Sequence, residues 1–314
     1  MVAKRLLPLL LALLLSACAP ATPAQGTQDP ELTLAATTYP VYLFACQVAG
    51  DVPDLRITLV VNQQLSCMHD YSLSITDMKV LEGADAILLS GAGLEDAMAP
   101  ALEAAGRPQI DCSAGIRLLC SAHDHDHDHD HGHAEEEGEE TDPHIWLDPR
   151  RACQMLDNLA QALGELDPVH AKQFSANAQA AQEEIMESYE QLKTQLAALS
   201  PRSLITFHDG FAYFAEAFDL DILEAIEEEA GSEASALEVK EILALLEAHR
   251  LPAIFTEVNG ATATAQLIGR EAGVTVAPLD LLMSSRESPL AGTDLYLSVL
   301  AANVSTIQEA YPCA

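Results

Sequence analysis

Short apolar segments alternate with helical patterns of ten or more residues through most of this 314-residue chain. The alternation runs through twice, and each half holds four strand candidates, at 32–37, 56–61, 86–90 and 108–111, then at 203–207, 221–225, 253–256 and 275–277. Strands that alternate with helices pair in parallel as βα units. We therefore predict an α/β fold with two lobes, each a four-stranded parallel sheet with flanking helices.

Two helical patterns lie between the halves. The first covers 150–166, and the second continues from 169 to 199 without a glycine or a proline. At about 1.5 Å per residue, roughly thirty residues span about 45 Å, which is long enough to run beside both lobes. We expect an N-terminal lobe at 32–166, a linking spine helix at 167–200 and a C-terminal lobe at 201–314.

The first residues predict export. Lys4 and Arg5 precede an apolar run at 6–15, and the sequence Leu-Ser-Ala then leads to Cys18. A basic flank, a short apolar run and small residues before a cleavage point are typical of a secretory signal peptide, here 1–17. Leu-Ser-Ala-Cys resembles the bacterial lipoprotein signal, which implies that the thiol of Cys18 receives a diacylglyceryl group. The alternative is ordinary secretion with a free thiol at Cys18.

On this interpretation the mature chain is exported across the cytoplasmic membrane. Acylated Cys18 then holds it on the lipid bilayer, at the cell surface or on the periplasmic face. Residues 18–31 are rich in Ala, Thr, Pro and Gln and suit a flexible tether. The net charge of −33 excludes nucleic acid as a partner, because phosphates would be repelled, whereas cations are attracted.

Six further cysteines follow Cys18, and an even number in an exported chain permits disulfides. They are Cys46, Cys67, Cys112, Cys120, Cys153 and Cys313. None forms a C-x-x-C pair, so we do not expect a zinc site built from thiolates.

Three histidines follow strand candidates. His69 comes after the second strand of the first half, His144 lies beyond the fourth strand of that half, and His208 directly follows the first strand of the second half. Ligands of parallel α/β sheets bind beyond the carboxyl ends of the strands. A cleft between the two lobes would therefore bring these histidines together.

Two carboxylates of the second half occupy similar places. Glu257 follows its third strand and Asp280 its fourth, so either could complete a four-ligand site with the histidines. Three neutral imidazoles and one carboxylate suit Zn²⁺, whereas Mn²⁺ favours more oxygen ligands. His170 and His249 lie in or near helical patterns, and we expect them to be surface or structural residues.

A run in which histidine alternates mostly with aspartate precedes His144, within a loop expected at 121–142. Its six histidines are His123, His125, His127, His129, His131 and His133. Such a charged run buries no core. Imidazole and carboxylate groups suit zinc, copper or nickel, so we predict that the loop collects metal ions at low affinity. The alternative is a loop that is only solvated.

Three motifs resemble the metal-specific solute-binding proteins of bacterial ABC importers, the zinc and manganese group. They are TYP at 38–40, DPHIWLDP at 142–149 and HDGFAYF at 208–214. The resemblance implies two four-stranded lobes joined by a long helix, with the metal held between them by His69, His144, His208 and Asp280. A histidine at 208 and a His-rich loop are typical of the zinc members. Zn²⁺ as cargo and an ABC permease membrane subunit as partner are therefore implied.

Two other functions fit parts of the pattern. An exported zinc hydrolase could use His69, His144 and His208 as ligands with Glu257 as a base, but the sequence has no H-E-x-x-H motif. A surface adhesin could use the same fold, and the sequence offers nothing for or against it. We predict a binding protein that performs no chemistry rather than an enzyme.

Overall fold

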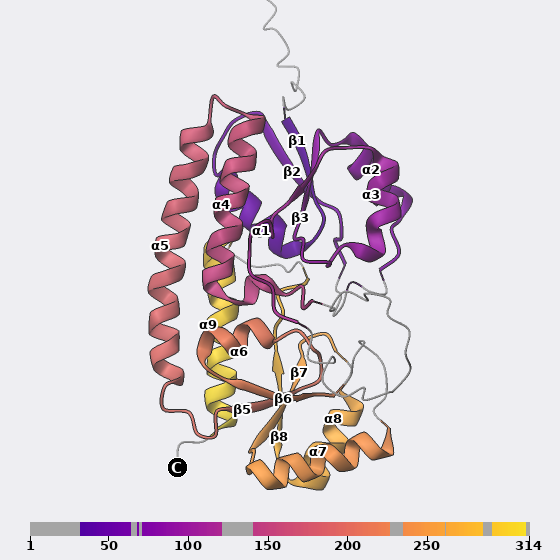
Figure 1. Ribbon diagram of the computed structural model, residues 1–314, viewed down its shortest axis with the longest axis vertical. Helices are drawn as coiled ribbons and strands as arrows, with labels where there is room; N and C mark the ends of the chain where they lie inside the picture. The colour runs from indigo at the N-terminus through magenta and orange to yellow at the C-terminus, as the bar shows by residue number, and fades with distance from the viewer. Residues whose placement is uncertain are drawn as a thin grey trace, which may run out of the picture.

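Two parallel sheets form the framework of the molecule (Figure 1). The computed structural model describes residues 32–63, 68, 71–120, 141–226, 235–260, 262–284 and 291–311. The sheets have the strand orders β2-β1-β3-β4 and β6-β5-β7-β8, and every pairing in them is parallel. The strands are β1 (Leu32–Ala36), β2 (Leu55–Leu59), β3 (Ala86–Leu89), β4 (Gln109–Asp111), β5 (Ser203–Thr206), β6 (Asp221–Ala225), β7 (Ala253–Glu257) and β8 (Thr275–Leu279). The predicted fold class is confirmed.

The first sheet is built around β1, whose residues Leu34, Ala35 and Ala36 are fully buried. Its helices are α1 (Tyr39–Ala49), α2 (Ile75–Gly83) and α3 (Ala99–Ala105), with a short 3-10 turn η1 (Asp96–Met98) before α3. A capping box begins α2, because Ser74 and Asp77 each accept a hydrogen bond from the other's backbone N–H. The apolar segment of β1 is thus a buried strand, and α2 forms where a helix is expected.

The second sheet is flanked by α6 (Ala212–Phe218), α7 (Ala236–His249) and α8 (Ala263–Ala272). A small apolar core that contains Ile205, Ile242 and Ile268 fills the space between this sheet and α7 and α8. A larger core is continuous between the lobes and reaches from Leu34 in β1 to Leu279 in β8. Because separating the lobes would expose that core, we expect small tilts rather than wide opening.

The lobes are joined by α4 (Pro149–Leu166) and α5 (Ala171–Leu196), which pack against each other. Helix α5 contacts α1 of the first lobe and α9 (Gly292–Ala310), which packs on β8 of the second. Figure 1 shows α5 running beside both sheets, as the predicted spine does. Neither α5 nor any other helix in the described ranges combines the length and apolar character of a membrane span.

The spine helix is shorter than the sequence predicts, since α5 covers Ala171–Leu196 instead of 169–199. A turn before the helix delays its start. The carboxylate of Asp167 accepts a hydrogen bond from the N–H of Val169 at 3.2 Å and lies 2.5 Å from Nδ1 of His170. These local bonds hold 167–170 in a turn, so the helix begins two residues later than predicted.

Three buried or half-buried cysteines, Cys46, Cys112 and Cys153, are free thiols. Burial raises the pKa of each, and it raises that of Cys153 to about 12. Protonated thiols are poor nucleophiles and poor metal ligands. These three cysteines take no part in the disulfides that the even number permits, while Cys67 and Cys313 lie outside the described residues.

A buried carboxylate, Glu95, ties two strand ends of the first sheet together. Its oxygens accept hydrogen bonds from the hydroxyl of Thr37 at 2.6 Å and from the N–H groups of Ser90 and Gly91 at 2.8 and 3.0 Å. Thr37 follows β1, and Ser90 follows β3. Burial raises the pKa of Glu95 to about 7, against the opposing effect of these hydrogen bonds.

This raised pKa predicts a pH dependence of folding. The folded chain keeps the Glu95 proton to about pH 7, whereas the unfolded chain loses it near the ordinary value of 4.5, so the contribution of Glu95 to stability falls as the pH rises between them. We expect metal-free wild type to lose about 2 kcal/mol of unfolding free energy relative to Glu95→Gln between pH 5 and pH 8. Urea unfolding of both proteins measures this. A difference independent of pH would contradict the prediction.

Candidate metal centre

His144 lies at the start of the 3-10 turn η3 (Ile145–Leu147) and is 5% exposed. Asp142 makes two contacts with His144. The Oδ1 atom of Asp142 accepts a hydrogen bond from the backbone N–H of His144 at 2.8 Å and lies 2.7 Å from Nδ1 of its ring. The tautomer that suits this contact carries its proton on Nδ1 and leaves the Nε2 lone pair available. A carboxylate behind the imidazole is the usual arrangement of a metal-binding histidine.

His208 comes from the other lobe, two residues after β5, and is 4% exposed. Its Nδ1 atom lies 3.2 Å from Oε1 of Glu257, the buried last residue of β7. The centres of the His144 and His208 rings are 5.2 Å apart, and the ring planes are nearly perpendicular, at 88°. Two buried imidazoles from different lobes, each beside a carboxylate, therefore meet at the sheet edges.

Gly210 makes room for this pair. A Cβ atom at position 210 would lie 2.7 Å from Cδ2 of His208 and 3.1 Å from both Cε1 and Nδ1 of His144. The contact with His208 is shorter than real Cβ atoms make, and the contacts with His144 would require that ring to shift by a few tenths of an ångström. The observed packing of the His208 ring, and to a lesser extent of the His144 ring, therefore requires a glycine at position 210.

Asp280 directly follows β8 and is partly buried. Its backbone is fixed by Asn303 of α9, which accepts from the N–H of Asp280 and donates to its carbonyl, both at 2.9 Å. Its Oδ1 atom accepts a hydrogen bond from the N–H of Leu282 at 2.7 Å. One residue further, the carbonyl of Leu281 accepts from Nε1 of Trp146 at 2.8 Å, which links this loop to η3.

The described part of the chain contains no group of three histidine, cysteine, aspartate or glutamate side chains arranged to hold one ion. Among the predicted ligands, His144 contacts His208, and His208 contacts Glu257. Asp280 does not complete such a group with them. His69, Cys18 and the six histidines at 123–133 lie outside the described residues. The four-ligand set therefore stays a prediction.

Sequence reasoning gave no role to Asp142, Gly210 or Asn303. The sequence could have pointed to Asp142 and Gly210, because each lies two residues from a candidate histidine inside one of the motifs described above. Asn303 carries no such signal, since it lies in the middle of a helix 23 residues from Asp280, and only the fold brings the two together.

A two-lobed α/β fold with a buried histidine pair between its sheets defines a class, the two-lobed solute-binding proteins. The family described as zinc-uptake complex component A, periplasmic (ZnuA), matches residues 34–310. The chain belongs to this family of extracytoplasmic metal-binding proteins of ABC uptake systems. Its members are transport receptors, so the protein is not an enzyme and the hydrolase alternative is wrong.

The individual relatives described below share less than a third of their residues with this chain. The zinc-binding lipoprotein AdcA of Streptococcus pneumoniae is 28% identical over 306 residues, which cover 97% of this chain but 60% of that protein. This chain therefore spans less than two thirds of the length of AdcA. A crystal structure of ZnuA superimposes with a TM-score of 0.75 at 29% identity and covers 90% of this chain and 99% of its own. A Mn-bound periplasmic metal-binding protein from Candidatus Liberibacter asiaticus has a TM-score of 0.76 at 23% identity, with 90% and 100% covered, and so shares the fold.

Proposed function

We propose that the protein captures Zn²⁺ outside the cytoplasmic membrane and delivers it to the membrane subunit of an ABC permease. The observation that carries the proposal is the meeting of His144 and His208, which come from separate lobes and lie 5.2 Å apart, both buried. Because each Nδ1 lies beside a carboxylate oxygen, Nε2 is the atom that each ring offers to an ion.

The proposed ligands are His69, His144, His208 and Asp280, with Glu257 as a possible addition. Glu257 supports His208 directly at 3.2 Å. Asp280 is the half-buried residue at the neighbouring strand end, where its backbone is held by two hydrogen bonds. Bringing Asp280 onto the ion requires its Oδ1 to exchange the N–H of Leu282 for the metal, or its other oxygen to bind.

The donor set favours zinc over manganese. Imidazole nitrogen is a good ligand for Zn²⁺, and a tetrahedral site of three nitrogens and one oxygen is typical of it. Mn²⁺ prefers oxygen ligands in larger number, which the two imidazoles of the described pair do not supply. The zinc named for AdcA and for the matching family agrees with this choice.

Delivery of the ion would depend on the lipid anchor. Acylated Cys18 would keep the protein on the bilayer beside its permease, and AdcA is itself described as a lipoprotein. Stable attachment needs at least two acyl chains, which a diacylglyceryl group supplies. Release of Cys18→Ser from the membrane fraction, with zinc binding unchanged, is the corresponding test.

The histidines at 123–133 are proposed to collect ions that the main site then takes. Because a run this highly charged is not expected to bury a core, an ion that binds there would have to fix its backbone, at a cost of about 1–2 kcal/mol of entropy for each residue. His144, His208 and Asp280 already make contacts within the folded lobes, so they avoid most of this cost. The loop sites are therefore expected to be weaker and more numerous.

Metal titration of the mature chain, with and without 123–133, tests the proposal. We expect both forms to bind one tight Zn²⁺ that an equal concentration of Mn²⁺ does not displace, and only the full chain to bind further, weaker ions. Calorimetry with native mass spectrometry measures both quantities. Preference for Mn²⁺ would refute the choice of ion, and loss of the tight site on deletion would move the primary ligands into the loop.

A further inference from the structure

The first turn of α6 carries a tyrosine that reaches from the second lobe to the first. Tyr213 lies five residues after His208 and is fully buried. Its hydroxyl accepts a hydrogen bond from the N–H of Leu119 at 2.9 Å and donates one to the carbonyl of Asp142 at 2.9 Å. Leu119 and Asp142 are themselves joined, since the N–H of Asp142 donates to the carbonyl of Leu119 at 3.0 Å. One hydroxyl thus fixes two neighbouring chain segments.

Asp142, whose carbonyl accepts the hydrogen bond from Tyr213, is also the residue that orients His144. The backbone carbonyl of Asp142 is held by Tyr213, and its carboxylate holds the ring and the N–H of His144. His208 lies in the short loop before α6, five residues before Tyr213. A path of two hydrogen-bonded steps therefore connects the two candidate ligands, although they come from different lobes.

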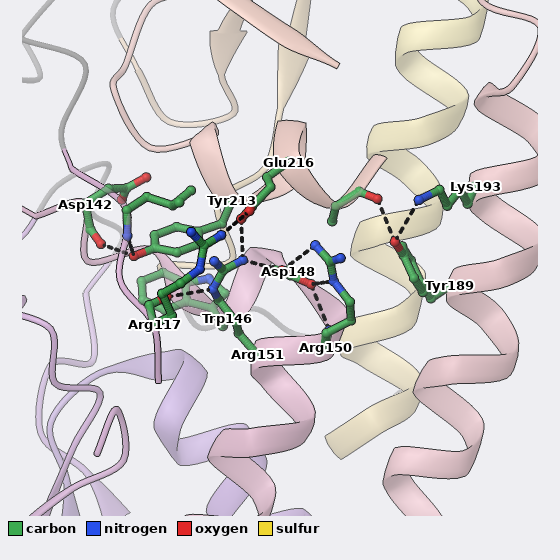
Figure 2. A network of polar contacts seen from close by, with 12 residues as sticks. Arg117, Asp142, Trp146, Asp148, Arg150, Arg151, Tyr189, Lys193, Tyr213 and Glu216 are labelled. Carbon is green, nitrogen blue, oxygen red and sulfur yellow. Dashed lines mark hydrogen bonds and ion pairs between the residues drawn. The ribbon is translucent and has the colours of Figure 1, made fainter. Parts of the chain in front are cut away.

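The ring of Tyr213 lies beside an arginine side chain (Figure 2). The guanidinium of Arg151 lies 4.7 Å from the centre of the ring. Arg151 is fixed in turn by the carboxylate of Asp148, by Glu216 of α6 at 2.6 Å and by the carbonyl of Arg117 at 3.0 Å. Burial raises the pKa of Tyr213 to about 12, so the hydroxyl keeps the proton that it donates.

We infer that Tyr213 is a positioning residue, which sets the place of His144 relative to His208 by clamping Asp142 across the lobe boundary. The inference rests on the proposed function, because it assigns Tyr213 a role in binding one ion between these histidines. Ligands held in place before the ion arrives lose less entropy on binding and release the ion more slowly. The hydroxyl would therefore act on the affinity and the geometry of the site without touching the metal.

Tyr213→Phe tests this, because it removes the hydroxyl and keeps the ring. Tyr311→Phe is the matched control, since Tyr311 is also buried and its hydroxyl donates to the carbonyl of Ser203, at the opposite end of β5 from His208. We expect Tyr213→Phe to release Zn²⁺ about tenfold faster to a chelator, at the low end of the effect of residues that orient a metal ligand. We also expect it to change the visible absorption of the Co²⁺-loaded protein, which reports ligand geometry. Tyr311→Phe should do neither.

Equal release rates and equal Co²⁺ spectra in the two variants would overturn the inference. A third variant, His208→Ala, distinguishes a failure of the inference about Tyr213 from a failure of the proposed function. If His208→Ala still binds the tight ion, the site itself is misplaced, whereas if it loses the ion, the comparison of the tyrosine variants stands. Should Tyr213→Phe not fold by circular dichroism, Glu216→Gln loosens Arg151 over the ring instead. It is expected to give the same spectral change to a smaller extent, and an unchanged spectrum would count against Tyr213.

Discussion

Replacement of His144 or His208 by alanine is expected to weaken Zn²⁺ binding more than about a hundredfold. Changes to residues that merely support a ligand cost about 10- to 100-fold in metal affinity, so the loss of a ligand should exceed this range. Both rings are buried, and water that replaces either one would lack the carboxylate that now supports it. Competition with a chelator of known affinity measures the change.

The other described histidines supply the controls. His170 lies before α5, where its ring contacts Asp167, and His249 is the last residue of α7. His170→Ala and His249→Ala should leave the affinity unchanged. If all four variants lost affinity equally, the effect would come from the number of histidines or from stability, and the pair would have no special role.

A side chain at position 210 is expected to weaken Zn²⁺ binding about 10- to 100-fold without removing any ligand. In Gly210→Val, the new Cβ would lie 2.7 Å from the His208 ring and 3.1 Å from the His144 ring, so both must move. Gly210 does not have the left-handed backbone that glycine favours, and valine is therefore excluded by the rings and not by backbone strain. Titration calorimetry against wild type gives the loss.

Gly83→Ala is the control for this change. Gly83 is the last residue of α2, a Cβ there would meet nothing within 4 Å, and its backbone is also outside the left-handed region. We expect this variant to bind like wild type. Wild-type affinity in Gly210→Val would mean that the two rings are not at the site of binding.

The fold was predictable because its signals are local. Apolar segments of β1, β3 and β7 are buried on both faces, as parallel strands between helices are, and their spacing leaves only helices as connections. The start of α5 was missed for an equally local reason. Asp167 bonds to the two residues before the helix, and this competes with the proline signal at the first helical turn.

The candidate site was predictable in part. Strand-end positions pointed to His144 and His208 as neighbours, and the rings do lie side by side, while their role as ligands stays a prediction. The contacts that position them depend on tertiary structure. Tyr213 meets Asp142 across 71 residues and Leu119 across 94, so no pattern in the sequence indicates these bonds.

A crystal structure of the zinc-loaded protein, with anomalous scattering recorded at the zinc edge, tests the central claim most directly. We expect one strong anomalous peak between the lobes, about 2.0–2.1 Å from Nε2 of both His144 and His208. We also expect Nδ1 of each ring to keep its carboxylate, Asp142 for His144 and Glu257 for His208. A principal peak elsewhere, with no metal on these two nitrogens, would contradict the claim.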